Sequence, residues 1–287
     1  GQRACFYRRS IELHVNPRIG DIKLRKLAGS APEAPRCLKW AFCYAIIALA
    51  QSMGLKATRE CNFFVESALM NFIFDMDGLM FDTERVFIKA WDYAGEKTGI
   101  GKAGYMVHKT LGMNIKTAYD AWKEEFGDKY NQEEVRKHSK DFLEKYYNEN
   151  PTPIKKGLYV LLDYLSGLNC KMAVASSSPR WEVEKHLNSA KVLDYFVGIA
   201  CGDMIENSKP APDIYLKACE ILGASPEACF ALEDSKNGLL AAYQAGCKPI
   251  MIPDLWQPDR DVLKIIIAKY DNLEQVKCAL EAGDLNL

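Results

Sequence analysis

From residue 70 onward, short apolar runs alternate with longer amphipathic segments, and this alternation constrains the fold more than any other feature of the sequence. The apolar runs predict five strands, at residues 72–74, 171–175, 197–201, 229–232 and 249–252. The segments between them predict helices at residues 179–189, 212–222 and 238–245. The pattern therefore predicts an α/β fold, with a Rossmann-like parallel sheet and helices on both of its faces.

One long segment interrupts the alternation. Residues 85–151 are charged and aromatic, contain no convincing strand and end in the turn signal Asn150-Pro151-Thr152-Pro153. Such a stretch predicts a helical insertion with a hinge on each side. The chain is accordingly expected to have a core formed by residues 70–84 and 152–287, and an inserted α-helical domain at residues 85–151.

The first 69 residues differ from the rest, because basic residues exceed acidic ones there and the reverse holds from residue 70 onward. Their one apolar stretch, residues 40–50, is shorter than the about 20 residues that a membrane span needs, and it lies too far along the chain for a secretory signal. We interpret residues 1–69 as an extension of unclear status, either sequence upstream of a natural start at Met70 or a poorly folded segment. A targeting role is the alternative.

Composition and charge limit the classes of function. With 48% hydrophobic and 26% charged positions among 287 residues, the chain can bury a sizeable core in one or two domains. Its formal net charge of -1 produces no overall field that would attract nucleic acid or an anionic membrane, so neither is expected as a partner. The cysteines are scattered without a C-x-x-C pair, which is typical of a reducing compartment. We expect a cytoplasmic monomer or weak homo-oligomer.

Polar residues follow four of the predicted strands. They are two aspartates, three serines, a lysine and an acid pair: Asp75 and Asp77, residues 176–178, Lys209, and Glu233 with Asp234. Ligands of open α/β sheets bind outside the carboxyl ends of the strands, so these side chains are expected to meet. Clustered carboxylates repel one another unless a cation neutralises them, and hard oxygen ligands favour Mg²⁺.

The same groups are suited to phosphoryl transfer. A lysine and a serine hydroxyl beside the metal would bind phosphate oxygens and offset the charge that develops during transfer. One carboxylate can then act as a nucleophile that forms an aspartyl phosphate, while a second moves a proton. The residues therefore predict a Mg²⁺-dependent enzyme that acts on a phosphate ester.

Four segments, DMDGLMFDTE, VASSS, SKPAPD and LEDSKNG, resemble in this order the four motifs of the haloacid dehalogenase (HAD) superfamily. More narrowly, they are similar to its subfamily I branch of phosphatases and β-phosphoglucomutases, in which a helical cap is inserted after the first motif. The resemblance spans residues 70–253. It implies a HAD-like core and a helical cap at residues 85–151.

The resemblance also implies a role for each acid of the motifs. Asp75 would be the nucleophile, and Asp77 would first be the general acid and then the general base. Mg²⁺ would be held by Asp75, the backbone carbonyl of Asp77 and Asp234. Glu233 would be either a further ligand or a partner of the ligands.

The transferring phosphoryl group would be bound by Ser176, Ser177 and Lys209 of the second and third motifs. Each also has a structural interpretation, because the serines could cap the helix expected after Pro179 and Lys209 could be a solvated surface residue. For the serines the two interpretations are compatible, since a helix N-terminus can itself bind phosphate.

These residues are compatible with several functions. The expected one is a Mg²⁺-dependent phosphatase that acts on a small phosphorylated metabolite, with sugar phosphates favoured by the resemblance. The alternative is a β-phosphoglucomutase-like phosphotransferase, although the histidine and arginine of those enzymes correspond here to Phe87 and Ile115. A dehalogenase would not need Asp77, and a non-catalytic binding protein would be expected to lose part of the acid set, so both are disfavoured.

Substrate choice is expected to depend on the inserted segment. Glu84 and Lys109 are the two candidates for contact with the substrate. Further residues of the same stretch that could face the site are Arg85, Trp91, Met113, Asn114 and Lys116. Residues of these types are more often part of a helix surface or of a small core.

Overall fold

The structure is a computed structural model of the chain, and it describes residues 70–110 and 115–285. The chain divides into two compact units, residues 1–69 and 70–287, and the following concerns the second. The expectations for residues 1–69, for Met113 and Asn114, and for the side chains of Ile115 and Lys116 lie outside what the structure describes.

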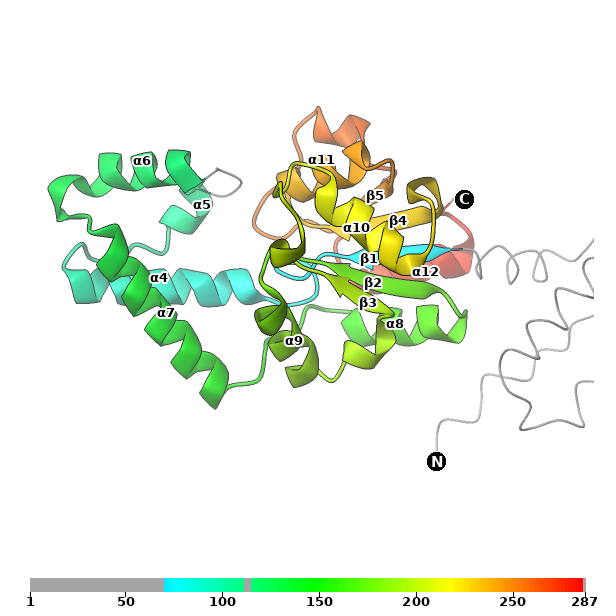
Figure 1. Cartoon of the computed structure of the whole chain (residues 1–287), viewed down its shortest axis with the longest axis horizontal. Coiled ribbons are helices and arrows are strands. Elements are labelled where there is room, and N and C mark those ends of the chain that lie inside the picture. Colours follow the sequence, from blue (N-terminus) through cyan, green and yellow to red (C-terminus); the bar gives the residue numbers. More distant parts are fainter. Residues whose placement is uncertain (1–69, 111–114, 286–287) are drawn as a thin grey trace, which may run out of the picture. The chain divides into compact units, whose positions relative to one another are not determined.

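The core is a parallel sheet with the strand order β3-β2-β1-β4-β5-β6 (Figure 1). The strands are β1 (Asn71–Phe74), β2 (Lys171–Ala175), β3 (Gly198–Ala200), β4 (Cys229–Glu233), β5 (Lys248–Met251) and β6 (Ala268–Lys269). All neighbouring strands run parallel, so the predicted fold class is confirmed. The sequence does not predict β6, because a strand of two residues exists only through its pairing with β5.

Helices cover both faces of the sheet, and Figure 1 shows α10 and α11 on one side and α8 on the other. The helices of the core are α8 (Leu158–Gly167), α9 (Arg180–Ser189), α10 (Asp213–Leu222), α11 (Lys236–Gln244) and α12 (Leu273–Ala282). Short 3-10 helices are η2 (Leu193–Tyr195), η3 (Gly202–Met204), η4 (Pro226–Ala228) and η5 (Val262–Lys264). The bounds of α9, α10 and α11 lie within two residues of the predicted ones, whereas α8 and α12 are not predicted.

The central strand β1 is buried along its whole length, as expected for a strand that helices cover on both faces. Ile73 belongs to a core cluster with Ala218 of α10 and Ala242 of α11. Phe72 stacks on Phe230 of β4, with ring centroids 5.2 Å apart. Apolar packing therefore fixes the strand whose carboxyl end carries the first two aspartates.

Between β1 and α8 the chain forms helices. They are α4 (Thr83–Thr98), α5 (Met106–Thr110), α6 (Ile115–Phe126), η1 (Gly127–Lys129) and α7 (Gln132–Glu149). This helical insertion has a cluster of buried residues of its own, which includes Met106, Trp122 and Val135. Helix α4 begins at Thr83, so the expected boundary before residue 85 falls inside a helix. The division into domains and the role of the insertion as a cap stay predictions.

Two connections join the helical insertion to the core, and they run beside each other. The backbone N–H of Asp82 donates to the carbonyl of Pro153, and that of Lys155 donates to Met80, both at 2.9 Å. An antiparallel bridge also pairs Phe81 with Ile154. The two connections therefore form one small paired unit next to the end of β1.

The described cysteines are free thiols, and all of them except Cys278 are buried. The Sγ atoms of Cys219 and Cys247 lie 3.7 Å apart, although the residues are far apart in the sequence. Within the described part of the chain, no helix has the length and apolar character that crossing a bilayer requires.

Candidate active site

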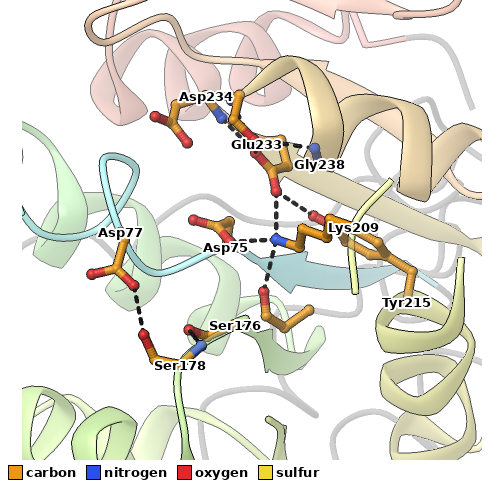
Figure 2. A network of polar contacts seen from close by, with 11 residues as sticks. Asp75, Asp77, Ser176, Ser178, Lys209, Tyr215, Glu233, Asp234 and Gly238 are labelled. Carbon is orange, nitrogen blue, oxygen red and sulfur yellow. Dashed lines mark hydrogen bonds and ion pairs between the residues drawn. The ribbon is translucent and has the colours of Figure 1, made fainter. Parts of the chain in front are cut away.

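The polar residues at the carboxyl ends of β1, β2 and β4 meet there, together with Lys209 from the loop after β3 (Figure 2). They share one edge of the sheet because β1 pairs with β2 on one side and with β4 on the other. Of the expected catalytic, metal-binding and phosphate-binding residues, only Ser177, which is exposed, is not among the labelled side chains: Asp75, Asp77, Ser176, Lys209, Glu233 and Asp234.

Lys209 is the buried cation of the site, with 8% of its side chain exposed. Its Nζ donates to Asp75 Oδ1 at 2.5 Å, to Glu233 Oε1 at 2.6 Å and to the carbonyl oxygen of Ala175 at 3.2 Å. Burial alone would lower the pKa of Lys209, but the attraction of the two carboxylates raises it above its usual range. Lys209 is therefore a fixed positive charge, and the interpretation as a solvated surface lysine is wrong.

The carboxylate of Glu233 is fully buried, and donors of the protein surround both of its oxygens. Oε1 accepts from Lys209 and, at 2.9 Å, from the hydroxyl of Tyr215. Oε2 accepts from the backbone N–H groups of Asp234 and Ser235 and from the Ser235 hydroxyl, each at 3.0 Å. Burial would raise the pKa of Glu233, but Lys209 and these hydrogen bonds hold it below its usual value. A carboxylate with these partners holds the side chains of Lys209, Tyr215 and Ser235 in place.

Asp75, Glu233 and Asp234 are the acids of the described chain that could share a metal ion, with carboxylate oxygens within 4.8 Å of one another. Burial raises the pKa of Asp75 well above its usual value, and the charge of Glu233 raises it further. The same two causes raise the pKa of Asp234. Three buried acids with Lys209 as the adjacent cation leave an excess of negative charge, which a divalent cation would relieve.

The turn after β1 is shaped so that the backbone passes close to the Asp234 carboxylate. Gly78 has a φ of +81°, and a Cβ atom added there would lie 2.2 Å from Asp234 Oδ2. Only glycine combines this backbone conformation with that close approach. The turn therefore keeps the backbone that follows Asp77 next to the Asp234 carboxylate. This arrangement would suit a cation that binds to the backbone and to that carboxylate.

The side chain of Asp77 lies outside the three-acid group, and hydroxyl groups hold it. Its Oδ1 accepts from Thr83 Oγ1 at 2.8 Å, and its Oδ2 accepts from Ser178 Oγ at 3.2 Å. Thr83 is the first residue of α4, so this acid touches the start of the helical insertion. Two hydroxyl contacts and partial exposure leave the carboxylate able to exchange a proton with a bound molecule.

Ser176 is buried at the end of β2, and its Oγ accepts from the backbone N–H of Ser178 at 3.1 Å. Helix α9 begins with Pro179 as its N-cap residue and without a side-chain cap, so the interpretation of the serines as helix caps is wrong. Ser176 instead holds the tight turn that leads from β2 to α9, beside the acids in Figure 2.

The two candidates for substrate contact lie in different surroundings. Burial raises the pKa of Glu84 to about 7, and the charges of Asp77 and Asp254 add to the shift. Lys109 pairs with Glu125 at 2.5 Å, within the helical insertion. Glu84 is thus close to the site acids, whereas the structure gives Lys109 a partner elsewhere, and substrate contact by either stays a prediction.

Three residues of the site region are not among those expected from the sequence. Tyr215 of α10 reaches Glu233, Thr83 reaches Asp77, and Asp254 after β5 accepts from Lys155 at 2.7 Å. Asp254 could have been found, because it follows the carboxyl end of a predicted strand, as the four motifs do. Tyr215 and Thr83 are recognisable only from their contacts.

Comparison with known proteins identifies the family. The family model described as haloacid dehalogenase-like hydrolase matches residues 72–252, which is more than half of the chain. A phosphorylated carbohydrates phosphatase of Thermotoga maritima is 30% identical over 182 residues, covering 62% of this chain and 82% of that protein. A beta-phosphoglucomutase of Bacillus subtilis is 28% identical over 180 residues, covering 61% of this chain and 79% of that protein.

Solved structures show the same fold. A hydrolase from Pseudomonas syringae aligns with a TM-score of 0.60 and 21% sequence identity, covering 74% of this chain and 98% of that chain. At this identity the likeness concerns the fold only.

Proposed function

Because the chain belongs to the haloacid dehalogenase-like hydrolases and is a phosphoric monoester hydrolase, we propose that it is a Mg²⁺-dependent phosphatase of a small phosphorylated metabolite. In this proposal the reaction proceeds through an aspartyl-phosphate intermediate. The observation that carries the proposal is the placement of Asp75, whose Oδ1 is held by Lys209 while its carboxylate belongs to the three-acid group. A nucleophile, a cation and a metal-binding set thus converge on one side chain.

The residues present suit Mg²⁺, which prefers oxygen ligands and often retains waters. Asp75, Asp234 and the backbone carbonyl of Asp77 would hold the ion. Glu233 would support them, because its oxygens are already used by Lys209, Tyr215 and the turn after β4. When bound, Mg²⁺ supplies positive charge that offsets the charge developing on the phosphoryl oxygens.

The protein groups account for both chemical steps. In the first, an Asp75 carboxylate oxygen bonds to phosphorus while the bond from phosphorus to the leaving oxygen breaks, and Asp77 gives that oxygen a proton. In the second, Asp77 takes a proton from water and the water oxygen bonds to phosphorus, while the bond from phosphorus to the Asp75 oxygen breaks, which gives inorganic phosphate and the free Asp75 carboxylate. Lys209 and Ser176 bind the phosphoryl oxygens in both steps.

Sugar phosphates are the substrate class that we favour, because the Thermotoga maritima relative is named for phosphorylated carbohydrates. A phosphotransferase is the second candidate, because a beta-phosphoglucomutase is also similar to the chain. Such an enzyme must return the phosphoryl group to its sugar before water takes it, which calls for polar contacts from the cap. Phe87 offers none at the position where those enzymes carry histidine.

The test is phosphate release from a panel of sugar phosphates, nucleotides and other small esters with Mg²⁺, with Asp75→Asn measured beside the wild type. We expect a preference for one class of ester, loss of turnover in Asp75→Asn with an unchanged circular dichroism spectrum, and silencing by EDTA that Mg²⁺ reverses. Substantial turnover by Asp75→Asn would refute the nucleophile. Conversion of β-glucose 1-phosphate to glucose 6-phosphate without phosphate release would establish the phosphotransferase instead.

A further inference from the structure

A buried carboxylate at the end of β5 holds both connections of the helical insertion. Asp254 follows β5 by three residues, and 2% of its side chain is exposed. Its Oδ1 accepts from Arg85 NH1 at 2.9 Å and from Lys155 Nζ at 2.7 Å. Arg85 lies in the first turn of α4, and Lys155 lies on the connection that returns to the core.

The burial of Asp254 distinguishes its ion pairs from those on the surface. In the pair of Lys236 with Asp259, the two side chains are 47% and 45% exposed. Among the described ion pairs, only the carboxylate of Glu233, at 0%, is less exposed than that of Asp254. A buried carboxylate that is held by two cations fixes their positions more strongly than an exposed pair does.

Arg85 and its two preceding neighbours link Asp254 to the catalytic acids. Thr83 donates to Asp77 Oδ1, and Arg85 binds Asp254 two residues later. Glu84 lies between them, and its pKa is raised by burial and then by the charges of Asp77 and Asp254. The first turn of α4 is therefore held at one end by Asp254 and contacts the proposed general acid at the other.

We propose that Asp254 is a positioning residue, which fastens the first turn of α4 to the end of β5 and so holds the Thr83 hydroxyl against the carboxylate of Asp77. The proposal rests on the proposed function, because it gives Asp254 its effect through proton delivery by Asp77. It assigns to the core, and not to the helical insertion, the residue that decides where this turn lies.

The dependence of the hydrolysis rate on the leaving group distinguishes this positioning role from a general contribution to the stability of the fold. Protonation of the leaving oxygen matters for an alkoxide such as that of a sugar, and little for p-nitrophenolate, which leaves readily without a proton. If Asp254 positions Asp77, Asp254→Asn should lower kcat/KM for a sugar phosphate by about tenfold or more, mainly through kcat. The kcat/KM for p-nitrophenyl phosphate should change by less than about threefold.

The experiment compares Asp254→Asn with Asp261→Asn, a matched control in an exposed ion pair with Lys264. Both substrates are measured with Mg²⁺ in the full chain, and the control should match the wild type on both. Arg85→Gln is the second variant, since Arg85 is half exposed and its loss leaves Lys155 bound to Asp254 while it breaks the pairs of Arg85 with Asp254 and Asp82. It should show the same selective loss even if Asp254→Asn does not fold.

Equal losses on the two substrates, or no loss on either, in Arg85→Gln and in any folded Asp254→Asn would overturn the proposal. A wild type that hydrolyses neither ester would instead contradict the proposed function. Wild-type hydrolysis of both, followed by selective loss in the variants, supports both proposals.

Discussion

Lys209 and Glu233 show how single residues prepare this site. Lys209 contacts two buried carboxylates, and both oxygens of Glu233 accept hydrogen bonds from donors of the protein. The cost of burying these charges is offset only while each keeps its partners. Function and stability are therefore coupled at this point, because Lys209, which would bind the phosphate, also neutralises Asp75 and Glu233.

Replacing Lys209 should destabilise the fold as well as stop turnover. Lys209→Met leaves Asp75 and Glu233 buried without their cation, so the free energy of unfolding should fall by about 3 kcal/mol. Urea unfolding in EDTA would measure it. Lys236→Met is the control, because both members of its pair are exposed, and it should cost less than about 1 kcal/mol. Equal effects of the two substitutions would contradict the buried-cation interpretation.

Glu84 should make stability depend on pH near neutrality. Its folded-state pKa of about 7 lies above the usual value of 4.5, so folding favours the protonated carboxyl. The stability that this carboxyl contributes is complete below its usual pKa and is lost as pH rises through about 7. Glu84→Gln cannot ionise, so it should gain stability relative to the wild type as pH rises.

The gain should reach about 2 kcal/mol between about pH 5 and about pH 8. Urea unfolding of Glu84→Gln and the wild type in EDTA at both pH values would measure it. A constant difference between the two proteins would mean that Glu84 ionises normally in the folded chain.

At the scale of elements, the turns after β1 and β4 decide the geometry more than the strands do. Gly78 lets the first turn approach Asp234, and Gly238 lets α11 pass Glu233, where an added Cβ would lie 1.6 Å from Oε1. The glycines in DMDGL and EDSKNG are therefore requirements of close packing. The approach at Gly78 involves Asp234, a proposed metal ligand, and the approach at Gly238 involves Glu233, which holds Lys209.

Gly78→Ala should weaken Mg²⁺ binding, because the new Cβ displaces the Asp234 carboxylate. We expect the Mg²⁺ concentration for half-maximal activity to rise about tenfold or more. Gly99→Ala is the matched control, since Gly99 has a similar φ of +79° but nothing within 4 Å of an added Cβ. Both variants carry the strain of a left-handed backbone, so a rise in Gly99→Ala as well would assign the effect to strain.

Prediction of elements succeeded where apolar runs and motifs coincide. The strands β1, β2 and β4 have local patterns that survive in the structure, and so do the helices α9, α10 and α11. Helices α8 and α12 contact each other, and β6 depends on β5. Their existence depends on partners distant in the sequence, which a local pattern cannot represent.

For the whole molecule, the described sheet begins at Asn71, and residues 70–287 form one compact unit. We predict that a chain of residues 70–287 folds without residues 1–69. Its thermal unfolding midpoint and its phosphate release should match those of the full chain. Failure of the shortened chain to fold would show that the interpretation of Met70 as a natural start is wrong.

The sequence by itself determined the fold class, the helical character of the insertion and the residues that follow the strands. It could do so because strands and helices have distinct apolar periods, and because parallel strands bring their carboxyl ends to one edge. Only the tertiary structure decided which groups touch. Lys209 pairs with Asp75 from 134 positions away, and Asp254 meets Arg85 from 169. Such contacts depend on strand order and on loop paths, which no local pattern records.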